Sequence, residues 1–124
     1  MRTEKVIYFS KADWDFISLL AKTGIGLNQA KMLVFLDRNG EATSRDIERG
    51  ADMRQSEVNI TGRKFLERGW VSISEKKSEG RSGRTPQLYR LIKSFPLIID
   101  DIEKEKKAEA QKELGLIEKI RNYQ

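Results

Sequence analysis

The chain has 124 residues, 38% hydrophobic and 35% charged, with a net charge of +5, so we predict one compact core with at most one appended element. It contains no cysteine and no histidine, which excludes thiolate nucleophiles, disulfides, imidazole bases and the usual zinc ligands. We therefore predict a protein that is not an enzyme and holds no metal or cofactor. The apolar runs are far shorter than the roughly 20 residues of a membrane-spanning helix, and no signal-peptide pattern is present, so a cytoplasmic location is expected.

Two helices are predicted in the first third of the chain. The first begins at Ser10 or Asp13, either of which suits an N-cap, and its apolar residues recur with helical spacing until Gly24 interrupts them. The second takes Asn28 as its N-cap and ends at Asn39–Gly40. Because the second helix is apolar nearly all round, it is expected to lie in the centre of the core.

A helix-turn-helix is predicted next. Thr43 stands three residues before Asp46, which is the spacing of a capping box, and opens a short helix with Ile47 facing the core. Gly50 is expected to end this helix in the left-handed conformation that glycine adopts at little cost. After a short turn, a fourth helix is predicted over about Gln55 to Arg68.

The fourth helix carries an inward apolar stripe of Val58, Phe65 and Leu66. Gly62 lies on that stripe, although a glycine inside a helix costs about 1 kcal/mol relative to alanine. We therefore expect Gly62 to allow a neighbouring backbone to approach the helix closely.

A β-hairpin is predicted after the fourth helix. Its strands cover Trp70–Ser74 and Gln87–Ile92, where β-branched and aromatic residues partly alternate with polar ones. The segment between them, Glu75–Pro86, is polar and basic and contains two glycines and a proline, so it is predicted to form the loop. Trp70 is expected to pack inward, and Tyr89 to support the hairpin.

A long charged helix is predicted from the Phe95–Pro96 pair to near the C-terminus. Its centre has almost no apolar side chains, so it lacks the sustained heptad of a coiled coil. The apolar residues towards its two ends are the candidates for contact with a second copy of the chain, and they are Ile99, Ile102, Leu114, Ile117 and Ile120. The predicted organisation is a domain over residues 1–94 and a dimerisation helix over residues 95–124.

The predicted fold is mainly α with a small β-hairpin, the layout of a winged helix-turn-helix with a long C-terminal helix. The sequence resembles the MarR and TrmB-type transcription regulators in Ser56–Asn59, in Phe65–Val71 and in the hairpin return Gly83–Leu91, which is similar to that of archaeal members. The resemblance covers roughly residues 26–93, and Gly62 departs from it because such helices usually carry a larger residue. It implies DNA binding through the fourth helix and the hairpin, or wing.

The distribution of charge agrees with this resemblance. The segment Arg54–Lys93 holds ten basic and four acidic residues, so all of the excess positive charge falls there. The outward face of the fourth helix carries side chains suited to base edges and phosphates, namely Arg54, Gln55, Ser56, Asn59, Ile60, Arg63 and Lys64. The wing, residues 75–86, carries the cations expected to contact the DNA backbone or the minor groove, namely Lys76, Lys77, Arg81 and Arg84.

We therefore predict a homodimeric transcription regulator that binds pseudo-palindromic double-stranded DNA with one recognition helix in each half-site. Two alternatives stay open. One is a winged-helix protein-interaction module in a larger transcription or chromosome assembly, which an apolar outward face would have favoured. The other is binding to structured RNA, to which a helix that fits the major groove is less suited. The sequence identifies no small-molecule effector.

Overall fold

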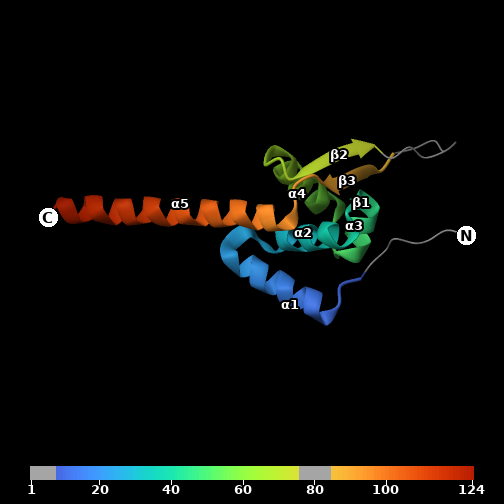
Figure 1. The fold of residues 1–124 in the computed structure, drawn as a ribbon, viewed down its shortest axis with the longest axis horizontal. Coiled ribbons are helices and arrows are strands. Elements are labelled where there is room, and N and C mark those ends of the chain that lie inside the picture. The colour runs from blue at the N-terminus through green and yellow to red at the C-terminus, as the bar shows by residue number, and fades with distance from the viewer. Residues whose placement is uncertain (1–7, 76–84) are drawn as a thin grey trace, which may run out of the picture. The chain divides into compact units, whose positions relative to one another are not determined.

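The computed structural model describes residues 8–75 and 85–124, and the chain forms two compact units, Met1–Ile92 and Lys93–Gln124. The elements of the first unit are α1 (Lys11–Leu20), a π-helical turn (Ala21–Ile25), α2 (Leu27–Asn39), β1 (Glu41–Thr43), α3 (Ser44–Gly50), α4 (Gln55–Glu67), β2 (Val71–Glu75) and β3 (Gln87–Leu91) (Figure 1). In this unit, α2 packs against α1 and also against the sheet (Figure 1). The architecture is mainly α with a small antiparallel sheet, as predicted. Among the described helices, none has both the length and the apolar content of a membrane span.

A reciprocal pair of hydrogen bonds defines the start of α1. The backbone N–H of Asp13 donates to Ser10 Oγ at 3.1 Å, and the backbone N–H of Ser10 donates to the Asp13 carboxylate at 2.9 Å. Ser10 is therefore the N-cap, and Asp13 is the third residue of the helix. Asp13 is buried and also accepts a hydrogen bond from the Arg38 guanidinium, which ties α1 to α2.

The beginning of α2 differs from the prediction. The helix is capped by Gly26, and Asn28 lies inside its first turn. Gly24 and Gly26 have φ values of 100° and 95°, a region that glycine enters without a side-chain clash. These two residues turn the chain directly from the π-helical segment into α2, so the helix begins before the polar residue that suggested the cap. The central place of α2 is confirmed, because every residue from Ala30 to Leu36 is buried.

The helix α3 begins as predicted, with reciprocal hydrogen bonds of 3.1 and 3.3 Å between Thr43 and Asp46. The predicted stop at Gly50 is wrong. Gly50 is the last residue of the helix and does not have positive φ, whereas Asp52 takes the left-handed conformation with a φ of 55°. Aspartate tolerates this conformation better than most residues. The Asp52 carbonyl accepts a hydrogen bond from the buried Lys31 ammonium at 2.9 Å, which fastens the turn between α3 and α4 to α2.

The buried stripe of α4 contains Thr61 in place of the predicted Leu66. It consists of Val58, Thr61, Gly62 and Phe65, and Leu66 is 47% exposed. The stripe is centred between Val58 and Phe65, and each residue turns the helix by about 100°, so Leu66 lies about a quarter of a turn away from that centre. Leu66 therefore faces the surface beside the sheet.

The sheet has three antiparallel strands in the order β1-β3-β2, so β3 is central. The strands β2 and β3 are the predicted hairpin strands, with ends that shift by one residue. The strand β1 was not predicted, and it pairs with β3 so that Glu41 forms an ion pair with Arg90 at 2.7 Å. Tyr89 of β3 lies opposite Ala42 of β1 and Ile73 of β2, which places it in the middle of the sheet.

The two tryptophans have structural positions. Trp70 is 1% exposed, as predicted, and its ring lies 5.4 Å from that of Phe65 between centroids. The Arg68 guanidinium covers the Trp70 ring at 4.5 Å. Trp14 is 39% exposed and contacts Phe9 edge to face at 5.0 Å. Trp70 is therefore a core residue, whereas Trp14 is an exposed residue of α1 that contacts the segment before the helix.

The second unit contains α5 (Phe95–Asn122), a continuous helix of 28 residues, as predicted. The five residues predicted to contact a second copy fall into two groups. Ile99 is half-buried and Ile102 is buried in the single chain. In contrast, Leu114, Ile117 and Ile120 are 64%, 48% and 65% exposed, so these three are available to a partner.

Candidate nucleic-acid interface

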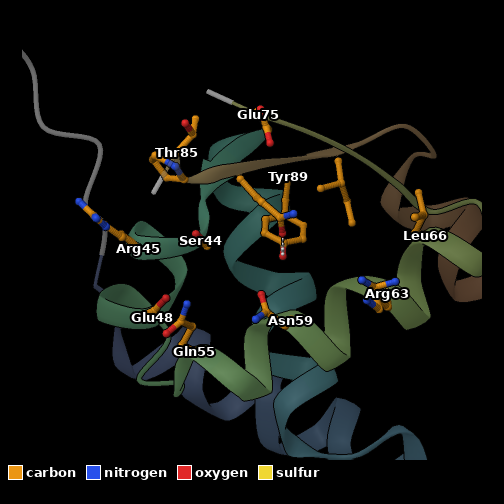
Figure 2. Close-up of a pocket in the computed structure, with 13 residues that line it drawn as sticks. Ser44, Arg45, Glu48, Gln55, Asn59, Arg63, Leu66, Glu75, Thr85 and Tyr89 are labelled. Atoms are coloured by element: carbon orange, nitrogen blue, oxygen red, sulfur yellow. Dashed lines mark hydrogen bonds between the residues drawn. The ribbon is translucent and has the colours of Figure 1, made fainter. Parts of the chain in front are cut away.

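The seven side chains of the predicted recognition helix are all exposed, but they point in different directions. Gln55, Asn59 and Arg63 recur every four residues and line a groove between α4, α3 and the sheet (Figure 2). Ile60 and Lys64 instead line a smaller hollow of about 310 Å³ beside the start of α2. The structure thus brings three of the predicted residues together in one groove and separates two others from it.

The remaining two, Arg54 and Ser56, lie at the capped start of α4. The backbone N–H of Arg54 donates to the Glu57 carboxylate at 2.8 Å. This backbone hydrogen bond holds the pKa of Glu57 below its usual value. Desolvation acts in the opposite direction, and a hydrogen bond with the Asn28 side chain lowers the pKa further. The carboxylate therefore stays ionised at the positive end of the helix dipole and fixes the end of α4.

The groove has a volume of about 780 Å³ and is lined from three sides (Figure 2). The lining residues are Ser44, Arg45 and Glu48 of α3, Gln55, Asn59, Arg63 and Leu66 of α4, Ile73 and Glu75 of β2, Thr85 and Pro86, and Gln87 and Tyr89 of β3. The groove thus combines two arginines, three side-chain amides and two carboxylates. Such a surface offers hydrogen bonds to a polar ligand rather than a dry apolar seat.

Sequence reasoning missed the contribution of α3. Ser44, Arg45 and Glu48 all line the groove opposite α4. A local signal for part of this wall exists, because helical spacing turns Arg45 and Glu48 away from the side on which Ile47 is buried, whereas Ser44 lies three residues before Ile47 on nearly the same side. Which outward side meets α4, however, depends on the turn at Asp52, and a local pattern does not contain that information.

The contact between α4 and the central strand forms the floor of the groove. Tyr89 is 1% exposed, and its hydroxyl donates to Gln87 Oε1 at 3.0 Å (Figure 2). Its ring packs on Gly62 so closely that a Cβ added there would overlap Tyr89 Cε2 and lie 3.1 Å from Cζ. The close approach predicted at Gly62 is present, but the partner is an aromatic side chain and not a backbone. Burial raises the pKa of the Tyr89 phenol, which keeps it a neutral hydrogen-bond donor.

The described part of the hairpin ends beside this groove. The last strand pair is Glu75 with Gln87, and Thr85 and Pro86 line the groove edge. The cations predicted on the wing lie outside the described residues, and they are Lys76, Lys77, Arg81 and Arg84.

Comparison with known proteins identifies the fold. No protein-family profile and no curated protein matches the sequence. Among solved structures, BpsR of Bordetella bronchiseptica, from a study of the regulation of its DNA binding by 6-hydroxynicotinic acid, is 11% identical over 90% of this chain and 92% of that one, with a TM-score of 0.52. YusO from Bacillus subtilis is 13% identical over 86% and 73%, also with a TM-score of 0.52.

A third similar structure is NMB1585, a MarR family regulator from Neisseria meningitidis. It is 15% identical over 87% of this chain and 84% of that one, with a TM-score of 0.50. The chain therefore has the winged-helix fold found in MarR-type regulators, as the sequence resemblance implied. The resemblance to TrmB-type regulators stays a prediction.

Proposed function

We propose that this winged-helix chain binds double-stranded DNA sequence-specifically and regulates transcription as a homodimer, with α4 as its recognition helix. The observation that supports the proposal most is the polar face of α4. Gln55, Asn59 and Arg63 line the groove, while Val58 and Phe65, about a third of a turn around the helix, are fully buried. A helix anchored on one side and polar on the other is suited to hold side chains against base edges.

The chemistry of the exposed residues fits the edges of bases. Arg63 can donate two hydrogen bonds to O6 and N7 of guanine, and the amides of Gln55 and Asn59 pair with N6 and N7 of adenine. Ile60 is 58% exposed and suits contact with the methyl group of thymine. Arg45, on the opposite wall of the groove, adds a cation for a phosphate.

The residues proposed to contact the DNA backbone are assigned from the amino-acid sequence. We assign these contacts to the wing cations Lys76, Lys77, Arg81 and Arg84, together with Lys64 of α4 and Arg68 directly after that helix. Six phosphate contacts correspond to a fall of log K against log salt with a slope of about −5 per subunit. A salt dependence of this size separates DNA binding from the open alternative of a protein-interaction module.

The proposed dimer is formed through α5. Leu114, Ile117 and Ile120 expose large aliphatic side chains near one another on this helix, and exposed apolar groups that cluster favour association. A two-fold pair would present two copies of α4 to half-sites about one helical turn of DNA apart.

Selection from a random duplex pool tests the proposal. The full-length protein is incubated with the pool at several salt concentrations, and the bound fraction is sequenced. We expect enrichment of a two-fold-symmetric motif and a steep loss of binding with salt. No binding to duplex DNA at low salt would refute the proposal and would favour the protein-interaction module.

A further inference from the structure

The Tyr89 ring on Gly62 joins the recognition helix to the central strand of the sheet. Tyr89 lies in β3 with Ala42 and Ile73 as its neighbours on the two flanking strands. Its ring rests on α4 at Gly62, between the positions of Asn59 and Arg63 (Figure 2). At this point the Tyr89 ring sets the spacing between β3 and the base-reading side of α4, while α4 also packs against β2.

The choice of glycine is costly for the helix itself. Gly62 lies inside α4, where alanine is a better helix former and needs no special backbone conformation. The φ of Gly62 is not positive, so backbone freedom does not explain the glycine. The space that a Cβ would need is filled by the Tyr89 ring, and close packing explains why no larger residue fits.

The hydroxyl of Tyr89 enters the polar groove. It donates to Gln87, and the charges of Arg63 on α4 and Glu48 on α3 both act on it. Gln87 follows Thr85 and Pro86, the described residues that lead from the wing into β3. One side chain thus contacts the recognition helix with its ring and the base of the wing with its hydroxyl.

We infer that Tyr89 is a positioning residue for DNA recognition, whose ring on Gly62 sets the height of α4 above β3 and thereby the register between the base-reading side chains and the base of the hairpin at Gln87. The inference rests on the proposed function. Its consequence is that a change in this contact alters discrimination between DNA sequences more than it alters general affinity, because the substitution removes none of the cations proposed to bind phosphates.

The test measures the affinity of four variants for the selected duplex and for a scrambled duplex. Gly62→Ala adds one methyl group under the ring. Gly115→Ala is the matched control, because it makes the same change within α5 and nothing lies within 4 Å of the added Cβ. Tyr89→Leu removes the ring, and the double variant Gly62→Ala/Tyr89→Leu tests whether the two positions are coupled. Thermal melting of each variant reports folding.

We expect Gly62→Ala to lower the ratio of specific to scrambled affinity by about tenfold, a size typical of residues in contact, with Gly115→Ala unchanged. In the Tyr89→Leu background, the added methyl should have a clearly smaller effect. If Gly62→Ala does not fold, Tyr89→Leu is the variant that decides. The inference then requires Tyr89→Leu to lower the ratio of specific to scrambled affinity.

Three results overturn the inference. If the natural chain discriminates and Gly62→Ala matches Gly115→Ala, the contact does not position α4. If both duplexes lose affinity equally, the contact supports stability alone. If the natural chain shows no preference for any duplex, the proposed function itself fails and the inference fails with it, so the two failures are distinguishable.

Discussion

Arg38 of α2 donates a hydrogen bond to Asp13, the same buried carboxylate that accepts the backbone N–H of Ser10 at the start of α1. One carboxylate therefore caps α1 and pairs with the helix in the middle of the core. A buried ionised group requires hydrogen-bond partners for each of its oxygens. Loss of the Asp13 charge should therefore weaken both the start of α1 and the link between α1 and α2.

Replacement of this carboxylate should destabilise the fold. We expect Asp13→Asn to lower the free energy of unfolding at neutral pH by about 2 kcal/mol, since it weakens a cap and a partly buried ion pair. Chemical denaturation measures the change. Asp15→Asn is the matched control, because Asp15 lies on the same helix in an exposed pair with Lys11 and should change stability by less than about 0.5 kcal/mol.

The same carboxylate predicts a pH dependence. The backbone hydrogen bond from Ser10 is the largest effect that lowers the pKa of Asp13, and Arg38 adds to it. The folded chain therefore binds this proton less readily than the unfolded chain, whose aspartates titrate near about 3.9. The stabilisation is complete above that value and is lost as the pH falls through the lower folded pKa.

The measurement compares unfolding of the natural chain and of Asp13→Asn across pH. The difference in free energy should be constant above about pH 5 and should shrink below about pH 4. A difference that grew towards acid would show that the sign of the pKa shift is wrong.

The elements that the sequence predicts well are those decided by nearby residues. The reciprocal hydrogen bonds at Ser10 and at Thr43 follow from residues three positions apart, and both are present. The strand β1 was missed because its partner is distant, as the pair of Glu41 with Arg90 spans 49 positions. Three residues of β1 are too few for an alternating pattern to appear.

The candidate site shows the same division. Helical spacing predicted the polar face of α4 with Gln55, Asn59 and Arg63, because that face follows from the local pattern. The opposite wall from α3 and the Tyr89 ring on Gly62 depend on how the elements meet, so the sequence showed only that Gly62 was unusual. The left-handed residue after α3 was assigned to Gly50 because propensity favours glycine, but it is Asp52, whose carbonyl accepts a hydrogen bond from the distant Lys31.

The bond between Lys31 and the Asp52 carbonyl gives a third prediction. Lys31→Met keeps the buried aliphatic stem and removes the ammonium, so the turn between α3 and α4 loses its tie to α2. We expect a loss of about 1–2 kcal/mol of stability by thermal or chemical unfolding. Lys22→Met, at an exposed position, is the control and should leave the midpoint unchanged. Equal behaviour of the two variants would show that the bond does not hold the turn.

The proposed dimer gives a fourth prediction. Ile117→Glu places a charge among the exposed apolar residues of α5 and should shift the chain from dimer to monomer at micromolar concentration. Sedimentation equilibrium measures the state. Lys112→Glu, an exposed change on the same helix, should leave the association intact. Persistence of the dimer in Ile117→Glu would exclude this surface as the interface.

The central claim is that α4 reads bases, and Arg63→Ala tests it most directly. The measurement is the ratio of affinities for the selected duplex and a scrambled one, with Lys104→Ala on α5 as the control for loss of one exposed positive charge. Loss of a bidentate contact is worth about 1–3 kcal/mol, so the ratio should fall roughly ten- to hundredfold in Arg63→Ala and stay unchanged in Lys104→Ala. A variant Arg63→Ala that keeps the full ratio would contradict the assignment of α4 as the base-reading helix.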